Sequence, residues 1–365
     1  MFHTSRKYKT GLISLTYLVV VALCILLAGC DINISGPGIG TGSSGSGCQG
    51  NCTTGAGVQG VQVIVEPDAG EHPITDAITS AKKSVWLEIY LLTDRNVIRA
   101  LEEAANRGVD VRVMLEPHPF GGGGSPARTM DQLKAAGAKV EASSPSFALT
   151  HEKGMIIDGT AAYIMTSNFS RAALGGSSGS SGFRNREYDI VDTNLQDVQA
   201  VSAIFQADWD RTTAQFNDSN LVVSPVNSRN AFTTLISSAH STLLVEAEEM
   251  NDPGIEQALA NAEQHGVKVQ VILPSPSGSG SSGDSNSQGI NTIKQGGVQV
   301  REDPRLYMHA KIIVVDGQKA FVGSENISTQ SLDKNRELGI LVSDAGVLHT
   351  LEQTFQQDWG DSQGV

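Results

Sequence analysis

Cysteine is scarce in this sequence, which restricts the chemistry open to its thiols. The four cysteines are Cys24, Cys30, Cys48 and Cys52, all close to the N-terminus of a 365-residue chain. Three residues separate Cys48 from Cys52, which is not the spacing of a catalytic CxxC pair, and no second pair supports a zinc site. A small local disulfide or two free thiols remain as interpretations. The sequence also lacks a Walker-type loop and an HExxH stretch, so nucleotide hydrolysis and zinc-dependent proteolysis are not indicated.

Positive charge is also in short supply. The chain has 26 lysines and arginines against 39 aspartates and glutamates, a net charge of −13. The first 29 residues hold three of the basic residues and no acid, so the remainder has 26 − 3 = 23 basic residues against 39 acidic, or −16. An acidic body repels nucleic-acid backbones at long range. We therefore expect no nucleic-acid partner, although a local basic cleft could exist within such a body.

The N-terminus carries a targeting signal. A basic start leads into the apolar run GLISLTYLVVVALCILLAGC, which predicts a secretory signal peptide. Its ending, LLAGC, resembles the bacterial lipoprotein cleavage box, which implies cleavage before Cys30 and a lipid on that thiol. An uncleaved anchor helix is the alternative, because the run is nearly long enough to span a bilayer. Either way we expect a body outside the cytoplasm, held at the periplasmic side of an inner membrane or the outer face of a plasma membrane.

The rest of the chain consists of a tether and an internal repeat. Residues 31–57 are mostly Gly, Ser and Thr, as in a flexible linker. Downstream, ALEEAANRGVDVRVMLEP at 100–117 matches ALANAEQHGVKVQVILPS at 258–275, an offset of 158. We therefore divide the chain into a lipoprotein signal peptide (1–29), a Gly/Ser-rich tether (30–57), a first half (58–215) and a second half (216–365).

Each half alternates strand and helix patterns. In the first half the expected strands are 61–66, 84–92 and 109–115, and the expected helices are 73–82, 96–107, 126–136 and 195–211. This alternation predicts an α/β fold, a duplicated α-β-α sandwich. We expect two similar halves, each with a mixed, mainly parallel sheet, packed as a pseudo-two-fold pair around a cleft.

One stretch in each half carries ionisable groups that suit phosphate chemistry. HEKGMIIDGTAAYIMTSNFS at 151–170 aligns without a gap to HAKIIVVDGQKAFVGSENIS at 309–328. Residues two apart on a strand share a face about 6–7 Å apart, so His151 and Lys153 point the same way. A turn after the strand can bring Asn168 back near His151. Lysine and asparagine bind phosphate oxygens without a metal, and histidine can act as nucleophile or general acid. Displacement at phosphorus needs groups on opposite sides, so each stretch supplies half a site.

The doubled HxKxxxxD, followed by GSxN or a close relative, resembles the phospholipase D superfamily over about residues 58–361. The resemblance implies a phosphodiesterase or phosphatidyltransferase that works through a phosphohistidine. It implies no metal and no cofactor, and a monomer with both half-sites in one chain. His151 and His309 would be nucleophile and general acid, with His151 attacking. Phosphate would be held by Lys153, Lys311, Asn168 and Asn326, with hydroxyl support from Thr166 and Ser324. Asp158 and Asp316 enter the catalytic set through the motif, with a structural role at the turn.

Two carboxylates and one methionine complete the predicted site. Glu187 and Glu337, each in an NRE triplet, resemble the family's carboxylates that hold the histidine's other nitrogen. The alternative for them is a salt bridge with the neighbouring Arg186 or Arg336. Met165 stands where the family has glycine, and we expect it to crowd the backbone near the phosphate.

These residues favour a membrane phospholipid as substrate, split into phosphatidate and a free head group. Hydrolysis by water is the first expectation, and transfer to an alcohol is left open. Three alternatives remain: a nuclease of the same superfamily, a cardiolipin synthase-like phosphatidyltransferase, or a catalytically silent module that binds anionic head groups.

Overall fold

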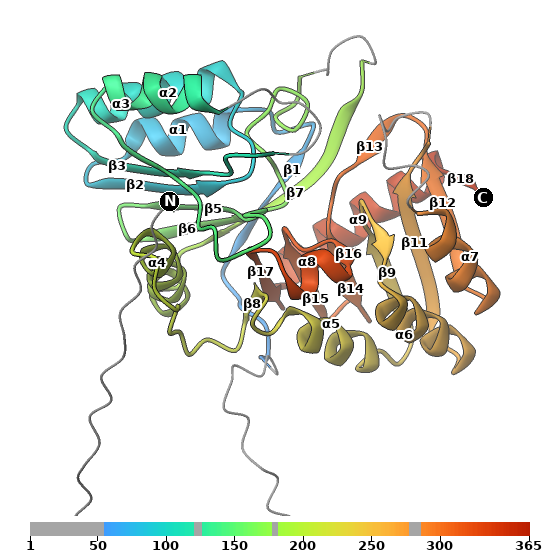
Figure 1. Cartoon of the computed structure of the whole chain (residues 1–365). Coiled ribbons are helices and arrows are strands. Elements are labelled where there is room, and N and C mark those ends of the chain that lie inside the picture. Colours follow the sequence, from blue (N-terminus) through green and yellow to red (C-terminus); the bar gives the residue numbers. More distant parts are fainter. Residues whose placement is uncertain (1–54, 120–125, 177–181, 277–285) are drawn as a thin grey trace, which may run out of the picture. The chain divides into compact units, whose positions relative to one another are not determined.

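The computed structural model describes residues 55–119, 126–176, 182–276 and 286–365 (Figure 1). The predicted signal peptide, most of the tether, Cys30, Cys48 and Cys52 lie outside these ranges. All described residues belong to one compact unit, Cys48–Val365. Within the described ranges, no helix combines the length and the apolar character needed to cross a membrane.

The first half is built on one sheet, with the strand order β1-β7-β6-β5-β2-β3-β4. Its strands are β1 (Gln62–Glu66), β2 (Ser84–Ile89), β3 (Asp110–Leu115), β4 (Lys139–Ala142), β5 (Lys153–Ile157), β6 (Ala161–Met165) and β7 (Arg184–Asp192). Its helices are α1 (His72–Ser80), α2 (Arg95–Asn106), α3 (Ala127–Ala135) and α4 (Leu195–Trp209). These helices lie where the apolar periodicity of the sequence predicts them.

The second half repeats this plan with the order β18-β12-β11-β9-β14-β15-β17-β8. Its sheet strands are β8 (Leu221–Ser224), β9 (Thr242–Glu246), β11 (Lys268–Pro274), β12 (Gln299–Asp303), β14 (Ile312–Val315), β15 (Lys319–Gly323), β17 (Glu337–Val342) and β18 (Gln363–Gly364). Its helices are α5 (Ser228–Ser237), α6 (Pro253–Gln264), α7 (Ser287–Gln295), α8 (Thr329–Asp333) and α9 (Ala345–Asp361). The short strands β10 (Met250–Asn251) and β16 (Ile327–Ser328) pair with each other, and β13 (Leu306–Met308) pairs with β7 of the first half.

The prediction of two similar halves with mixed sheets is confirmed, but the prediction that the sheets are mainly parallel is wrong. In the first sheet β2, β3 and β4 run parallel, whereas β5, β6, β7 and β1 join by antiparallel pairs. Parallel neighbours need a crossover, which α2 and α3 provide, whereas the tight turn between β5 and β6 can only produce an antiparallel pair. The second sheet has the same division.

Three apolar clusters hold these layers together. One packs α1, α2 and α3 on the first sheet, and a second packs α5, α6 and α7 on the second sheet. The third contains side chains of both sheets together with α4 and α9, including Val201, Phe205, Leu351 and Phe355. Burying each such large side chain contributes about 1.5–3 kcal/mol. The two halves therefore share a core and form one body.

Two buried ion pairs also join the halves. Arg186 of the first half donates to both carboxylate oxygens of Asp358 in the second, at 2.6 and 2.8 Å. Arg336 of the second half pairs with Asp208 of the first at 2.8 Å. All four side chains are at most 3% exposed, so removal of one partner leaves a buried charge and costs about 3–5 kcal/mol. Since both arginines are engaged here, the salt-bridge alternative for Glu187 and Glu337 is wrong.

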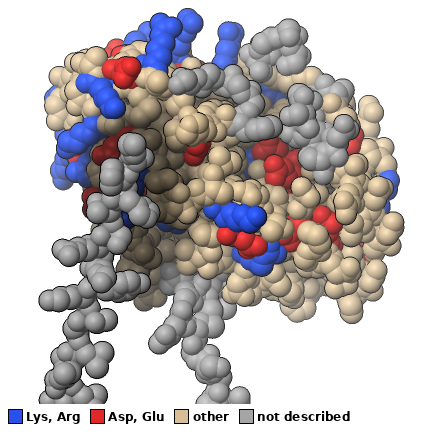
Figure 2. Space-filling model, in the orientation of Figure 1, with Lys and Arg blue, Asp and Glu red and all other residues tan. Residues whose placement is uncertain are grey.

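Charges of both signs share the face drawn in Figure 2. Lysine and arginine side chains gather at its upper left, where Figure 1 places α1, α2 and α3. Arg95 and Arg99 of α2 and Arg128 of α3 are exposed. The net charge of −13 therefore describes the whole chain and not this part of its surface.

Candidate active site

The two motif aspartates fix turns rather than contact the histidines. The Asp158 carboxylate accepts hydrogen bonds from the backbone N–H groups of Lys82, Lys83 and Ser84, at 2.6–3.1 Å. Asp316 accepts from His240, Ser241 and Thr242 in the same way. Both aspartates have positive φ angles, 55° and 54°, as their tight turns require. Seven residues of mostly extended chain place Asp158 roughly 20 Å from His151. The prediction that Asp158 and Asp316 are catalytic is therefore corrected, because both residues have a structural role at their turns.

Each motif histidine is paired with a carboxylate from the opposite half. Thr150 forms a β-bridge with Arg336, and the His151 N–H donates to the Arg336 carbonyl at 2.9 Å. This register puts the next side chains together, so His151 Nδ1–H donates to Glu337 Oε2 at 2.9 Å.

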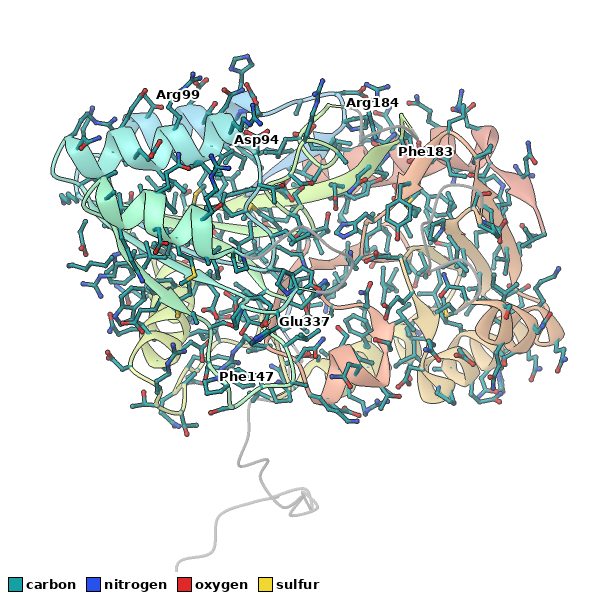
Figure 3. All side chains as sticks on the ribbon, turned by 45° about the horizontal axis from the view of Figure 1, so that its top comes forward. Asp94, Arg99, Phe147, Phe183, Arg184 and Glu337 are labelled. Carbon is teal, nitrogen blue, oxygen red and sulfur yellow. The ribbon has the colours of Figure 1, made fainter. Side chains whose placement is uncertain are left out.

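The second histidine follows the same rule. Strands β13 and β7 pair in parallel with Met308 opposite Arg186. His309 Nδ1–H then donates to the Glu187 carboxylate at 2.8 Å. Glu337 lies in the interior, where the ribbons of the two halves meet (Figure 3). The sequence predicts the carboxylate partners, and the fold pairs them crosswise.

The predicted phosphate-supporting hydroxyls bind these carboxylates instead. Thr166 Oγ1–H donates to Glu187 Oε2 at 2.7 Å, and Ser324 Oγ–H donates to Glu337 Oε2 at 2.8 Å. Each hydroxyl oxygen also accepts a backbone N–H, from Tyr188 and Leu338 respectively. Both side chains are fully buried, so the predicted hydroxyl contact with phosphate is wrong.

Two asparagines were missed by the sequence analysis. Asn185 Nδ2 donates to Glu187 Oε1 at 2.9 Å, and Asn335 Nδ2 donates to Glu337 Oε1 at 3.1 Å. Ser331 Oγ–H adds a further bond to Glu337 at 2.7 Å. The repeated NRE triplet was the available signal, because its asparagine recurs as faithfully as its glutamate. These donors hold each carboxylate in the orientation that meets the histidine of the other half.

Burial and charge set the protonation of the first pair. The pKa of His151 is lowered, first by burial and then by the positive charge of Lys153, while Glu337 opposes the shift. Burial alone would raise the pKa of Glu337, but His151 and Lys153 together lower it by more, so the net shift is downward. A neutral His151 that donates from Nδ1 keeps its lone pair on Nε2. That is the tautomer a nucleophilic imidazole needs.

The two motif lysines are buried and lie in different surroundings. Each Nζ donates to the carbonyl of the histidine two residues earlier, at 2.5 Å. Lys311 Nζ also donates to Glu248 Oε2 at 2.9 Å. Among the described residues Lys153 has no carboxylate within 4.0 Å, and its Nζ lies 5.3 Å from the centre of the Tyr90 ring. Burial lowers the pKa of Lys153 to about 7, against the pull of Glu337.

The two motif asparagines lie at the same end of their sheets as the histidines. Asn168 and Asn326 are each 5% exposed. Phe169, which follows Asn168, donates its N–H to the Leu91 carbonyl. Tyr90, which precedes Leu91, donates its N–H to the carbonyl of Glu152, the neighbour of His151. Asn326 Nδ2 approaches Glu248 Oε2 at 3.4 Å. Their binding of phosphate stays a prediction.

Glu248 is a residue of the site that the sequence analysis did not identify. Its carboxylate accepts from Lys311 and from the Tyr307 hydroxyl, both at 2.9 Å, and lies 3.5 Å from His309 Nε2. The position 158 residues earlier holds Tyr90, whose ring packs edge-on against His151 with centroids 4.7 Å apart. Repeat comparison passes over this pair because its two members differ in type.

Met165 does not crowd the site. It is fully buried in the apolar cluster beneath α1, α2 and α3. Its counterpart Gly323 faces Gly339, and a Cβ at Gly323 would lie 2.4 Å from the Gly339 Cα. Asp189 takes the place of that facing glycine in the first half, so the local packing differs and a side chain fits. The predicted crowding near phosphate is therefore wrong.

One group of acidic side chains has the geometry of a metal site. Carboxylate oxygens of Glu88, Glu152 and Asp208, all buried, lie within 4.8 Å of one another. Arg336 already donates to Asp208 at 2.8 Å and supplies the positive charge. Burial raises the pKa of Glu152 to about 8 and raises that of Glu88 well above its usual value. The group therefore fits a proton-sharing, arginine-bound cluster.

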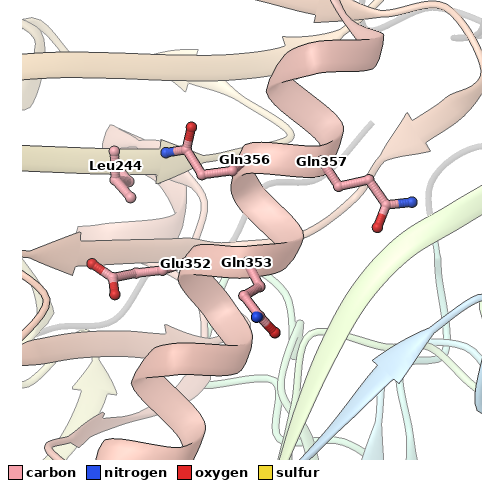
Figure 4. A pocket seen from close by; sticks show the side chains of 5 residues that line it. All are labelled: Leu244, Glu352, Gln353, Gln356 and Gln357. Carbon is pink, nitrogen blue, oxygen red and sulfur yellow. The ribbon is translucent and has the colours of Figure 1, made fainter.

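A surface pocket elsewhere contains none of the predicted site residues. It has a volume of about 580 Å³ and lies between Leu244 of β9 and the polar side chains Glu352, Gln353, Gln356 and Gln357 of α9 (Figure 4). This pocket is therefore separate from the site that contains the paired histidines.

Comparison with known proteins agrees with this geometry. A family described as "Cardiolipin synthase, PLD-like domain" matches residues 74–209 and 232–359, one match in each half. A cardiolipin synthase of Oceanobacillus iheyensis is 24% identical over 332 residues, covering 82% of this chain and 68% of that protein. The major cardiolipin synthase ClsA of Bacillus subtilis is 25% identical, with 82% and 68% covered. The chain thus spans about two thirds of the length of these relatives.

Solved structures share the fold. A phosphatidylserine synthase of Haemophilus influenzae has a TM-score of 0.62 at 15% identity, covering 84% of this chain and 87% of that one. The polyphosphate kinase of Porphyromonas gingivalis has a TM-score of 0.66 at 16% identity, covering 84% and 48%. With a family match in each half and a histidine, lysine and asparagine set in each, the chain belongs to the phospholipase D superfamily.

Proposed function

We propose that this protein is a phosphatidyltransferase of the cardiolipin synthase type, which moves a phosphatidyl group from one phospholipid to a hydroxyl group of another. The observation that carries the proposal is the crosswise pair of buried histidine–glutamate contacts, His151 with Glu337 and His309 with Glu187. They form one site from two halves in a chain whose family and curated relatives are described as cardiolipin synthases.

The reaction proceeds in two displacements. The His151 Nε2 lone pair attacks phosphorus, the bond from phosphorus to the leaving oxygen breaks, and His309 gives that oxygen a proton. The second lipid's hydroxyl then gives its proton to His309 and attacks phosphorus, which breaks the bond to His151. Glu337 and Glu187 hold the rings and stabilise the positive charge that each acquires.

Hydrolysis, the first expectation from the sequence, becomes the competing outcome. Water and a lipid hydroxyl would attack the same phosphohistidine, so one site can perform both reactions. Similarity to proteins named as synthases favours the lipid hydroxyl. The exposed cations of the first-half helices, such as Arg95 and Arg99, would suit an anionic lipid surface.

Anchoring through a lipidated Cys30, with the body outside the cytoplasm, is part of the proposal. Such an anchor would keep the site next to its substrate and raise the local lipid concentration. Mass spectrometry of the N-terminal peptide from membranes tests it, because an unmodified Met1 peptide would contradict cleavage before Cys30.

The deciding experiment is a product analysis with the full chain in vesicles of phosphatidylglycerol, with a metal chelator present. We expect a lipid with two phosphatidyl groups, together with free glycerol. His151→Asn and His309→Asn should each lower the rate by about 10³-fold or more. His349→Asn, on the exposed side of α9, is the matched control and should keep full activity. Phosphatidate and glycerol without the two-phosphatidyl lipid, at any lipid density, would establish hydrolysis instead, and cleavage of DNA alone would establish a nuclease.

A further inference from the structure

One edge of the first half carries four exposed arginines. Strands β2 and β3 end at this edge, and Lys153 lies opposite Ile89 at the end of β2, so the edge also carries the first-half motif. None of the salt bridges among the described residues involves these arginines. We call the group the arginine edge, and its members are Arg95 and Arg99 of α2, Arg128 of α3, and Arg171 in the segment after the motif.

The start of α2 is fixed beside the motif by backbone hydrogen bonds. Thr93 and Asp94, which precede Arg95, both donate their N–H groups to the Phe169 carbonyl, at 2.8 and 2.9 Å. Phe169 follows the motif residue Asn168 in the chain. The N-terminal end of α2, with its exposed arginines, therefore lies next to the segment that carries the predicted phosphate-binding asparagine.

The other two arginines belong to the same edge. Ala172, which follows Arg171, accepts the N–H of Asn185, and the Asn185 side chain in turn donates to Glu187 at 2.9 Å. Arg128 is in the first turn of α3, which connects the parallel strands β3 and β4. Because parallel strands end at one edge of a sheet, the helix that connects two of them begins at that edge.

The second half lacks this group of arginines. Uncharged residues stand at the corresponding positions: Pro253 and Gln257 of α6, Gln288 of α7, and Thr329. Residues 72–139 contain nine lysines and arginines against eight acids, whereas the corresponding residues 230–299 contain two against seven. Figure 2 shows the cations gathered where Figure 1 places the first-half helices. Since the second half builds the same fold without these arginines, the fold itself does not require them.

We propose that the arginine edge is an interaction surface for the anionic head groups of a lipid bilayer, and that it turns the first half-site towards the membrane that contains the substrate. The inference deepens the proposed function and rests on it for the identity of the partner. It concerns residues outside the repeated motifs and outside the catalytic groups.

Charge complementarity carries the argument. Each lysine or arginine near an anionic bilayer surface increases binding about fivefold, so four of them increase it about 10²–10³-fold. Arginine also binds phosphate oxygens through two parallel hydrogen bonds, which suits phospholipid head groups. At its own edge the second half places the partly exposed Glu248 and Glu249 where the first half has Tyr90 and Leu91. A bilayer would therefore attract the first half more strongly than the second.

A nucleic acid is the competing anionic partner. Binding of single strands commonly adds stacking of bases on open aromatic rings. In the described ranges every Phe, Tyr and Trp side chain is buried or half-buried, so none offers a fully exposed ring. The curated relatives named as cardiolipin synthases also favour a lipid partner. The observations thus favour the bilayer, and a DNA duplex is included in the test.

The test compares two sets of substitutions that remove the same charge from opposite edges of one helical layer. The first set is Arg95→Gln, Arg99→Gln, Arg128→Gln and Arg171→Gln. The control set, at the edge of the Asp158 turn, is Lys82→Gln, Lys83→Gln, Lys134→Gln and Lys139→Gln, all at exposed positions. Helix α2 separates the two edges by roughly 18 Å, which exceeds the screening length of about 10 Å at 0.1 M salt. A third variant replaces the four arginines with lysine and keeps the charge.

Binding is measured by vesicle flotation with residues 31–365. This protein keeps every residue of the compact unit Cys48–Val365 and lacks Cys30, whose predicted lipid would hold any variant on a vesicle. The His151→Asn background prevents turnover of the lipid. The vesicles contain phosphatidylcholine alone, or phosphatidylcholine mixed with phosphatidylglycerol or, at equal charge density, with phosphatidylserine.

We expect binding to both anionic vesicles and little binding to phosphatidylcholine alone. The arginine-to-glutamine set should lower binding about 10²-fold or more, whereas the lysine set and the arginine-to-lysine variant should lower it less than about tenfold. With His151 restored, all variants should hydrolyse the soluble diester bis(p-nitrophenyl) phosphate at the wild-type rate, which shows that they fold. In the full chain, the arginine-to-glutamine set should slow product formation in phosphatidylglycerol vesicles.

The outcomes are distinct. Equal losses of binding in the two glutamine sets would show that net charge alone acts, and would overturn the proposal. Equal binding to phosphatidylcholine vesicles would overturn it as well, as would binding to phosphatidylglycerol without binding to phosphatidylserine. Tighter binding to a DNA duplex than to either anionic vesicle would replace the bilayer with a nucleic acid. Failure to make a two-phosphatidyl lipid, with arginine-dependent vesicle binding intact, would reject the proposed function and leave the surface supported.

Discussion

The crosswise pairing of histidines and glutamates makes a prediction that separates this fold from a side-by-side arrangement of two independent halves. Glu337→Gln should alter His151, which lies 186 residues away in the chain, and Glu187→Gln should leave His151 nearly unchanged. Because glutamine keeps the shape of the side chain, each variant removes a charge and little packing. The two variants are therefore matched controls for each other.

The size of the effect follows from the contact. His151 Nδ1–H donates to a fully buried carboxylate at 2.9 Å, and Glu337 raises the pKa of His151 against burial. A hydrogen bond to a charged group contributes about 1.5–3 kcal/mol, and one pKa unit corresponds to about 1.36 kcal/mol. Glu337→Gln should therefore lower the pKa of His151 further, because the buried imidazolium would lose a hydrogen bond of this strength.

Turnover should fall as well. The positive charge that His151 acquires on attack loses its partner in Glu337→Gln, so we expect kcat to drop by about 10²–10⁴-fold with little change in KM. Histidine-selective NMR titration measures the pKa, and steady-state kinetics measure the rate. A pKa of His151 that responds to Glu187→Gln and ignores Glu337→Gln would refute the crosswise arrangement.

Three further predictions concern the parts of the fold that support the site. Asp158→Asn and Asp316→Asn should each lower the free energy of unfolding by about 1–3 kcal/mol, since each loses charged acceptors of backbone N–H groups, and should leave kcat of the folded protein unchanged. Denaturant unfolding beside kinetics checks this, and a thousandfold loss of kcat would restore their catalytic assignment. Gly323→Ala should destabilise the protein by about 1–3 kcal/mol, because its Cβ would meet the Gly339 backbone at 2.4 Å, whereas Gly360→Ala has open space and should be tolerated. Glu88→Gln should match the wild type near pH 5 and be more stable near pH 9, measured by urea unfolding at both pH values. The reason is that the raised pKa keeps Glu88 protonated in the folded state, so the wild type loses stability as pH rises above the unfolded value near 4.5, and an amide does not. Equal loss of stability in both proteins would show that Glu88 is ionised in the fold.

Local patterns predicted the elements well and their assembly less well. The helices at α1, α2, α3 and α4 follow from apolar spacing and from caps such as Asp94, which accepts the N–H groups of Asn96 and Val97. The proportion of antiparallel pairing was not predicted, because alternating strands and helices indicate parallel crossovers, whereas the strands around the hairpin at Asp158 and Gly159 pair without helices between them. That hairpin places β5 against β6, and with β7 and β1 it makes most of each sheet antiparallel.

Repetition between the halves marked most residues of the site, but it did not show which contact each side chain makes. Thr166 and Ser324 were assigned to phosphate from their place in the motif, yet their hydroxyls turn to Glu187 and Glu337. Glu248 was missed because its counterpart is Tyr90, so no repeat marks it. A motif records which residue types occur together, and it does not record which atom each side chain reaches.

The sequence by itself determined the duplication, the motif stretches next to β5 and β14 that carry His151 and His309, and the glutamates that serve them. These properties depend on residue type and short-range spacing, which the chain displays directly. Only the tertiary structure decided that each glutamate serves the histidine of the other half. The physical reason is strand register: Thr150 pairs with Arg336, and Met308 pairs with Arg186, across more than a hundred residues of chain. Cross-half contacts of this kind come from the shared core and from buried pairs such as Arg186 with Asp358, which no local pattern encodes.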